Sequence, residues 1–361
     1  MVALGVSDRL GLRYTRQPMK AVGFRTAKRV KGWVRLMWID WVAGLHLVLV
    51  NVGAGGPFLV AAMEAVPRTE SVHVASWARC LLWLSLAGLL LGSVLGLLVG
   101  WHLWPHGLGT IVRCMPSKIQ FGVWEWVFSV VCLVVQLVWW YRAPEATVWV
   151  RWVRAAVGVV GSTNLLYHFP VLFAVITELM HGGIAGGEVI SASEFRRLLV
   201  TSSAGPRALH AAVASLGIGA SALMMVAAWP TRRIAPYWIR WAAMWIAATT
   251  LGQWLIGFWV TTSLPPAAGR RLLGGSPLLL AVFVVCVLLA LVITQLAARL
   301  CLNDPDRRVA LLTAALVVLL AILMTWVSRQ TMAPIRLPSE SANHWGLRYP
   351  PAVMVKGAFH E

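Results

Sequence analysis

The sequence contains eight apolar stretches that are each long enough to cross a lipid bilayer as a helix. A helix rises about 1.5 Å per residue, so about 20 residues span the roughly 30 Å of hydrocarbon. Lipid offers no hydrogen-bond partners to the backbone, so each stretch must satisfy its own amides as a helix. We predict an all-α integral membrane protein with about eight transmembrane helices, near 34–64, 76–101, 118–141, 152–178, 208–229, 237–262, 275–300 and 309–328.

The composition supports a chain whose solvent is lipid. Hydrophobic residues make up 59% of it and charged residues only 12%, against about 25% charged residues in soluble domains. The net charge of +18 arises mainly from the N-terminal region and from the segments between apolar stretches. Basic residues in such places act as topology signals and contact anionic lipid. We therefore expect the membrane as a partner and no nucleic acid.

The spacing of the stretches predicts two four-helix bundles joined by one longer connection. We expect a basic N-terminal tail (1–33), a first transmembrane bundle (34–178), a connecting loop (179–207), a second bundle (208–328) and a C-terminal tail (329–361). Eight spans place both termini on one side. Basic residues are fewer in the loops on that side, which favours periplasmic termini in a cytoplasmic (inner) membrane. The basic N-terminal tail argues for the reverse orientation.

The five cysteines do not form a covalent or metal-binding motif. They lie in or beside apolar stretches at no metal-ligand spacing, and the CxxCH sequence that attaches haem covalently does not occur. Most are expected to be small buried apolar residues. A haem in this chain would therefore be bound non-covalently.

Four histidines are expected to collect in the half of the membrane nearest the termini. His46 and His168 lie within the first and fourth stretches, His210 opens the fifth, and His102 closes the second. Ionisable residues inside a membrane are expensive and are functional candidates by default, and neutral imidazole is a common axial ligand of haem iron. An interhelical hydrogen bond is an equally good explanation for any one of them, and His102 can also be solvated at the interface.

Glycines in the second apolar stretch and a glutamate in the third each have more than one possible role. Glycines recur every four residues on one face of the second stretch, which suits either close helix packing or a flat ligand; they are Gly88, Gly92, Gly96 and Gly100. Glu125 in the third stretch can ligate iron, relay a proton, pair with a histidine or form a structural hydrogen bond. The remaining histidines, His73, His106, His181, His344 and His360, are expected to be solvated.

Two long segments resemble the large subunit of cytochrome bd quinol oxidases. LHLVLVNVGAGGPFLVAAMEAV (45–66) is similar to that family's first helix, and ISASEFRRLLVTSSAGPRALHAAVASLGIGASALMMVAAW (190–229) is similar to the stretch that ends around a low-spin haem ligand. GSTNLLYHFPVLF (161–173) lies where the family has its fourth helix, and SRQTMAP (328–334) looks like its GRQPW motif. The resemblance puts His46 and His210 at the positions of haem ligands.

The chain also departs from that family. The large quinol-binding loop between the sixth and seventh helices is missing, so the chain looks like a short form of the family. The two glutamates of the family's third helix fall near Gln120 and Phe128. The glutamate that ligates a high-spin haem has no counterpart in the apolar stretch 309–324, and the seventh stretch lacks the methionine that ligates the low-spin haem.

The resemblance implies electron transfer through one to three non-covalent b-type haems, in a subunit of a respiratory complex with a cytochrome c-like or quinone redox partner. His46 and His168 would hold one haem, and His210 and His102 are candidate ligands for others. Arg207 and Arg113 lie on the side where they would pair with haem propionates. The first alternative is a terminal oxidase that reduces O2, which the displaced glutamates argue against. The second is a haem-free transporter or structural membrane subunit.

Overall fold

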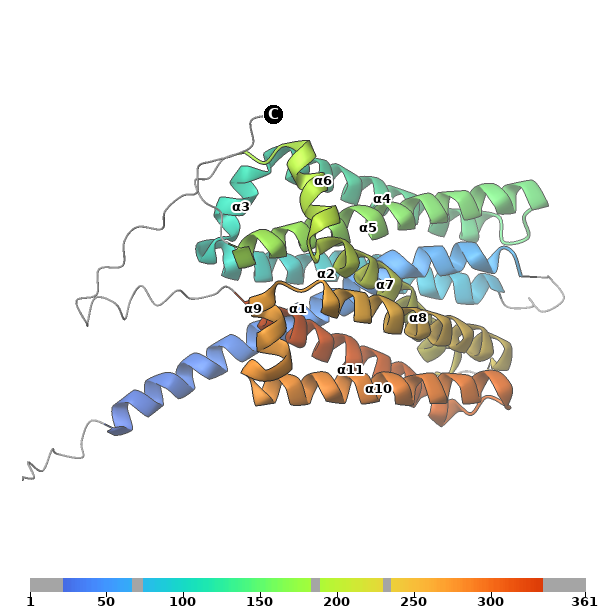
Figure 1. The fold of residues 1–361 in the computed structure, drawn as a ribbon. Coiled ribbons are helices and arrows are strands. Elements are labelled where there is room, and N and C mark those ends of the chain that lie inside the picture. The colour runs from blue at the N-terminus through green and yellow to red at the C-terminus, as the bar shows by residue number, and fades with distance from the viewer. Residues whose placement is uncertain (1–21, 67–73, 183–188, 230–234, 334–361) are drawn as a thin grey trace, which may run out of the picture.

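The computed structural model describes residues 22–66, 74–182, 189–229 and 235–333, and these residues form helices and connecting turns without a β-strand (Figure 1). Eight helices are long and apolar enough to cross a membrane. They are α1 (Val22–Met63), α2 (Val74–Leu103), α4 (Pro116–Arg142), α5 (Val148–Gly182), α7 (Ala204–Ala227), α8 (Pro236–Thr262), α10 (Pro277–Leu302) and α11 (Arg307–Thr331). The predicted all-α membrane protein with eight spans is confirmed.

The helices extend beyond the expected boundaries, most of all at the start of the first span and on both sides of the expected connecting loop. α1 begins at Val22, so residues 22–33 of the expected N-terminal tail continue the first helix. The expected connecting loop contains a short helix, α6 (Ala192–Thr201). Its start is capped by Ser191, whose hydroxyl accepts a hydrogen bond of 3.1 Å from the backbone N–H of Glu194. Ser and Glu three residues apart are the signature of a capping box.

The other short elements lie beside the ends of the spans. They are the 3-10 turn η3 (Trp104–His106), α3 (Leu108–Cys114), α9 (Pro266–Arg270) and the π-helical turn η4 (Arg271–Gly275). Gly107 joins η3 to α3 with a φ of 104°, a backbone conformation that glycine adopts readily and other residues rarely. We call the face where α1 begins and α11 ends the terminal face, at the left of Figure 1, and the other the far face.

The spans pack as two four-helix bundles, as the sequence predicts. In the first bundle, α1 packs against α2 and α5, and α4 closes the ring by contacting both of those helices. In the second, α7, α8, α10 and α11 form a matching ring. α1 and α7 lie at the junction, since α7 also contacts α1 and α5, and α1 also contacts α11.

Glycines allow α1 and α7 to approach backbone to backbone. A Cβ on Gly55 of α1 would overlap the carbonyl oxygen of Ser215 in α7. A Cβ on Gly219 of α7 would lie 3.0 Å from the carbonyl carbon of Gly55. Small residues at such crossings are the usual means of close helix association in lipid. The two bundles are therefore joined by direct backbone contact.

The apolar core is concentrated in the half of the bundle nearest the far face. Its buried side chains come from the ends of α1, α4, α7 and α10 and from the starts of α2, α8 and α11. Leu59 and Met63 of α1, Leu81 of α2, Leu223 of α7 and Ile246 of α8 are all essentially inaccessible. The buried apolar clusters described elsewhere are smaller. The terminal half, which holds the four candidate histidines, therefore has no apolar core of this size among its described residues.

Candidate functional site

His46 is held on α1 with one ring nitrogen fixed and the other unassigned. Its Nδ1 lies 2.7 Å from the carbonyl oxygen of Gly92 in α2. A carbonyl can only accept a hydrogen bond, so Nδ1 carries the proton and Nε2 carries the free lone pair. Metal-ligating histidines are typically oriented in this way, by a hydrogen bond from the other ring nitrogen to a carbonyl or carboxylate. The geometry of His46 therefore suits an axial ligand.

The glycine stripe of α2 receives α1 and the imidazole of His46. A Cβ on Gly88 would lie 2.7 Å from the carbonyl oxygen of Leu49, and one on Gly92 would meet Val50 at a similar distance. A Cβ on Gly96 would lie 2.7 Å from Cε1 of His46. Helix packing thus accounts for Gly88 and Gly92, and the absence of a side chain at Gly96 makes room for the histidine ring.

His210, near the start of α7, has a buried nitrogen without a partner. Among the described residues, neither Nδ1 of His210 nor Oε1 of Gln253 in α8 has a hydrogen-bond partner, although both are buried. Gln253 is held in place because its Nε2 donates to the backbone carbonyl of His210 at 2.7 Å. Gly257 lies beside the ring, since a Cβ there would be 3.6 Å from Cε1. A buried polar atom left unpaired costs about 1–3 kcal/mol, so a bound group that engages these atoms would be favoured.

His168 faces α4 rather than α2. Its Nε2 lies 3.9 Å from Oε1 of Glu125, and 31% of its side chain is exposed. Its ring packs edge-on against Phe121 and Tyr167, with centroids 5.2 and 5.0 Å away. His46 and His168 therefore contact different neighbours, and their sharing of one haem stays a prediction.

His102 lies near the end of α2 in an aromatic contact. Its ring centroid is 5.8 Å from that of Trp38 of α1, in an edge-on arrangement. The side chain is partly exposed, close to the terminal face. This position agrees with the expected interfacial location, and its role as a haem ligand stays a prediction.

The two arginines expected to pair with propionates differ in how many of their N–H groups already donate hydrogen bonds. Arg207 Nη2 donates to Glu178 Oε2 at 2.7 Å and to the carbonyl of Ala174 at 3.0 Å. Its Nε also donates to the carbonyl of Ser203. Arg207 therefore ties α7 to α5. Arg113 of α3 is exposed, and within the described part of the chain its side chain makes one long hydrogen bond of 3.5 Å, to Thr110, so it remains available to a ligand or to lipid.

His181 was expected to be solvated, and that expectation is wrong. It lies in the last turn of α5 with 8% of its surface exposed. Its Nδ1 is buried and has no hydrogen-bond partner in the described part of the chain. The reason is that α5 continues to Gly182, whereas the apolar stretch predicts an end at 178 and thus a loop position for His181. His73, His344 and His360 lie outside the described residues, as does the side chain of His106.

The described residues contain no group of three or more His, Cys, Asp or Glu side chains that could hold a metal ion by themselves. Haem iron is coordinated by the porphyrin and needs only one or two protein ligands. The relevant test for haem is therefore the state of individual histidines. Of the four candidates, His46 has an oriented Nε2 and His210 has a buried unpaired nitrogen, a feature that His181 shares.

No protein-family model matches this chain, and no curated protein matches it. Among solved structures, the chain is similar to the bd oxidase from Geobacillus thermodenitrificans, with a TM-score of 0.64 and 14% sequence identity. The match covers 82% of this chain and 85% of that chain. At this identity the likeness concerns the fold, and it agrees with the resemblance seen in the sequence. The chain is thus an α-helical membrane protein with a bd-oxidase-like fold.

Proposed function

We propose that this protein carries electrons through non-covalently bound b-type haem in a respiratory membrane complex. The observation that carries the proposal is the geometry of His46, whose Nδ1 is fixed by the Gly92 carbonyl while Nε2 keeps its lone pair. This is how a protein orients an imidazole for a metal. The bd-oxidase-like fold supports the proposal, because that solved protein is an oxidase of the same architecture.

His210 is the proposed ligand in the second bundle. Its unpaired Nδ1 and the unpaired Oε1 of Gln253 give a bound cofactor two polar atoms to engage. His168 and His102 are proposed as additional ligands, so that one to three haems are held. When bound, haem supplies one-electron transfer between ferric and ferrous iron. The chain orients the imidazoles and provides an apolar surround of low dielectric constant, which affects the redox potential.

Of the two arginines proposed to pair with haem propionates near the terminal face, one is accessible and the other is already paired. Arg113 is exposed near the terminal face and is the proposed propionate partner. Arg207 would have to share a guanidinium that already binds Glu178. We propose that the haems lie in the leaflet at the terminal face, on the periplasmic side of the inner membrane. The redox partner would be a quinone or a cytochrome c-like protein, with other subunits of the complex alongside.

One observation favours a second candidate function. The imidazole of His168 and the carboxylate of Glu125 lie 3.9 Å apart inside the membrane, an arrangement suited to passing protons. Proton delivery is needed by a terminal oxidase that reduces O2, and a proton relay also serves a haem-free transporter. Haem content distinguishes the transporter from the other two functions, and O2 consumption distinguishes the oxidase from the electron carrier.

The test is a reduced-minus-oxidised absorbance spectrum of the detergent-purified protein, with a pyridine haemochrome assay for stoichiometry. We expect sharp b-type bands and at least one haem per chain. Oxygen uptake with a reduced quinol analogue, and carbon monoxide difference spectra, are measured on the same sample. A folded preparation without haem would overturn the proposal and favour the transporter, whereas sustained O2 reduction would favour the oxidase.

A further inference from the structure

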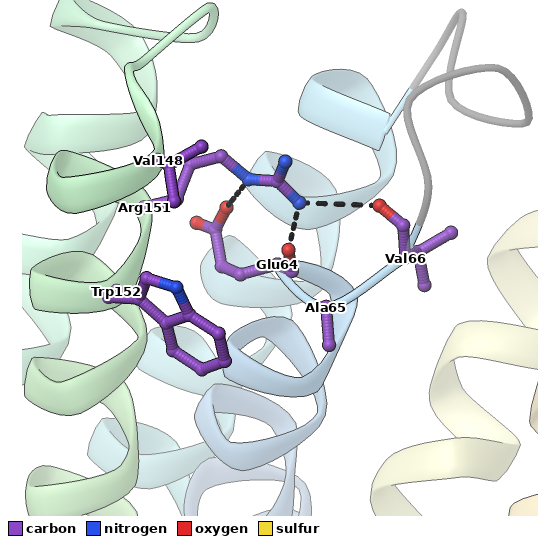
Figure 2. A pocket seen from close by; sticks show the side chains of 6 residues that line it. All are labelled: Glu64, Ala65, Val66, Val148, Arg151 and Trp152. Atoms are coloured by element: carbon purple, nitrogen blue, oxygen red, sulfur yellow. Dashed lines mark hydrogen bonds and ion pairs between the residues drawn. The ribbon is translucent and has the colours of Figure 1, made fainter.

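The far face carries a cluster of three charged side chains that the proposed electron transfer does not use. Glu64 comes from the end of α1, and Arg151 and Arg154 come from the first two turns of α5 (Figure 2). Two guanidinium groups thus share one carboxylate, and the cluster has a net charge of +1. It lies across the membrane from the four candidate haem ligands.

Arg154 neutralises the carboxylate charge of Glu64. Its Nε and Nη2 both bond to the Glu64 carboxylate, the second at 3.0 Å. Its Nη1 donates to the carbonyl of Ala143 at 2.8 Å, and its guanidinium lies over the ring of Trp140 at 3.6 Å. Arg154 is 1% exposed. Because Arg154 is buried together with the carboxylate it binds, it is not accessible to a ligand.

Arg151 supplies the surplus positive charge. Its Nη2 donates to the backbone carbonyls of Glu64 and Val66, and its Nε lies 3.4 Å from Glu64 Oε2. Within the described residues its Nη1 has no hydrogen-bond partner, and 20% of its side chain is exposed. In Figure 2 this nitrogen points away from the carboxylate. Arg151 is thus oriented by one set of bonds and keeps donor capacity for another.

Arg151 lines an open pocket of about 220 Å³, a volume equal to several water molecules at about 30 Å³ each. The other lining residues are Glu64, Ala65, Val66, Val148 and Trp152 (Figure 2). α5 begins at Val148, and its first turn contains no acidic residue. The unpaired amides and positive dipole end of a helix N-terminus also favour an anion.

Two exposed tryptophans set the depth of this pocket. Trp149 and Trp152 are 80% and 60% exposed at the start of α5. Exposed tryptophans at the ends of membrane spans lie at the level of the lipid headgroups. An anion at this depth is most readily the phosphate of a lipid, since basic pockets between transmembrane helices bind anionic headgroups.

We propose that the pocket at Arg151 binds the phosphodiester of an anionic phospholipid from the leaflet at the far face. Arg151 Nη1 donates to the phosphate, the start of α5 adds its dipole, and Trp152 and Val148 contact the glycerol and first acyl carbons. The Glu64–Arg154 pair holds Arg151 in place. The site is independent of haem binding.

The test is native mass spectrometry of the purified full chain, titrated with phosphatidylglycerol or with phosphatidylcholine in detergent. We expect wild type to retain one phosphatidylglycerol in preference to phosphatidylcholine. Arg151→Gln should weaken that binding about tenfold, the effect of losing one charge-assisted hydrogen bond. Arg142→Gln is the matched control, because Arg142 is an exposed arginine at the same face that does not line the pocket.

A second variant guards against misfolding of Arg151→Gln. Val148 is 63% exposed, so Val148→Glu should fold normally while it places a competing carboxylate beside Arg151. Phosphatidylglycerol binding as tight as wild type in both variants would overturn the proposal. Loss of bound lipid in millimolar inorganic phosphate, with phosphate retained in its place, would instead assign the pocket to a free oxyanion and reject the lipid.

Discussion

Asp40 and Arg329, 289 residues apart, join the start of the first span to the end of the last. Arg329 Nε donates to Asp40 Oδ1 at 2.7 Å, and Gln330 Nε2 donates to Oδ2 of the same carboxylate at 3.0 Å. Only 8% of the Asp40 side chain is exposed. The SRQ sequence that resembles a family motif thus ties α11 to α1 and connects the two bundles at the terminal face.

Removing the charge of Asp40 should destabilise the protein. Asp40→Asn leaves Arg329 without its carboxylate partner, and the cost of losing a charge-assisted bond in a largely buried place is about 2 kcal/mol. The measurement is thermal unfolding in detergent. Asp304→Asn is the control, since Asp304 pairs with Arg240 at 3.0 Å on the exposed surface, where such pairs contribute little. Equal effects of the two changes would mean that the Asp40 pair is as weak as a surface pair.

Replacing each principal histidine should remove its own haem signal. His46→Ala deletes the oriented Nε2 in the first bundle, and His210→Ala deletes the imidazole with the unpaired nitrogen in the second. We expect each variant to lose a different component of the reduced-minus-oxidised spectrum and to contain less haem per chain. Full haem content in both variants would contradict the assignment of the ligands even with the fold intact.

Gly96 should control the position of His46. In Gly96→Ala the new methyl carbon would lie 2.7 Å from His46 Cε1, so the ring must move and the bond to Gly92 must weaken. We expect a shifted spectrum and reduced haem retention. Gly100→Ala is the matched control one turn further along α2, where, among described atoms, the methyl would meet Leu108 Cδ2 at an ordinary contact distance of 3.9 Å. A Gly96→Ala spectrum identical to that of Gly100→Ala would contradict a ligand role for His46.

Gly55 should be essential for joining the bundles. In Gly55→Ala the methyl would overlap the Ser215 carbonyl of α7. Both groups belong to backbones packed in the bundle, so relief requires the helices to separate. We expect a loss of about 3 kcal/mol, at the upper end for overpacking, read as a lower unfolding temperature. No described residue lies within 4 Å of a Cβ at Gly269 of α9, so Gly269→Ala should match wild type.

The spans were predictable because bilayer thickness and hydropathy fix their length. Every transmembrane helix coincides with an expected apolar stretch to within about one turn at its membrane ends. The short helix α6 was not predicted, even though Ser191 and Glu194 carry a capping signal, because hydropathy identifies spans and not the short exposed helices that connect them. The burial of His181 was not predicted for a related reason: the exact residue at which a helix ends is the least certain feature of a sequence-based prediction.

Side-chain partners were less predictable than helices. The glycine stripe of α2 suited either a flat ligand or a neighbouring helix, and the periodicity that reveals a common face does not identify what packs against it. The same holds for Arg207: its side of the membrane followed from topology, but its bond to Glu178 depends on how α5 and α7 pack. The helix that carries each histidine was predictable, whereas the direction of each ring depends on helix rotation.

The position of the apolar core has a consequence for local stability. Side chains such as Leu59, Leu223 and Ile246 hold the helices together near the far face, while the histidine-bearing ends combine smaller apolar clusters with polar links such as that of Asp40 and Arg329. The helices are thus packed most extensively at one end of the molecule. We therefore expect the ends of the helices near the far face to resist local unfolding most, and amide hydrogen exchange to be faster at the histidine-bearing ends.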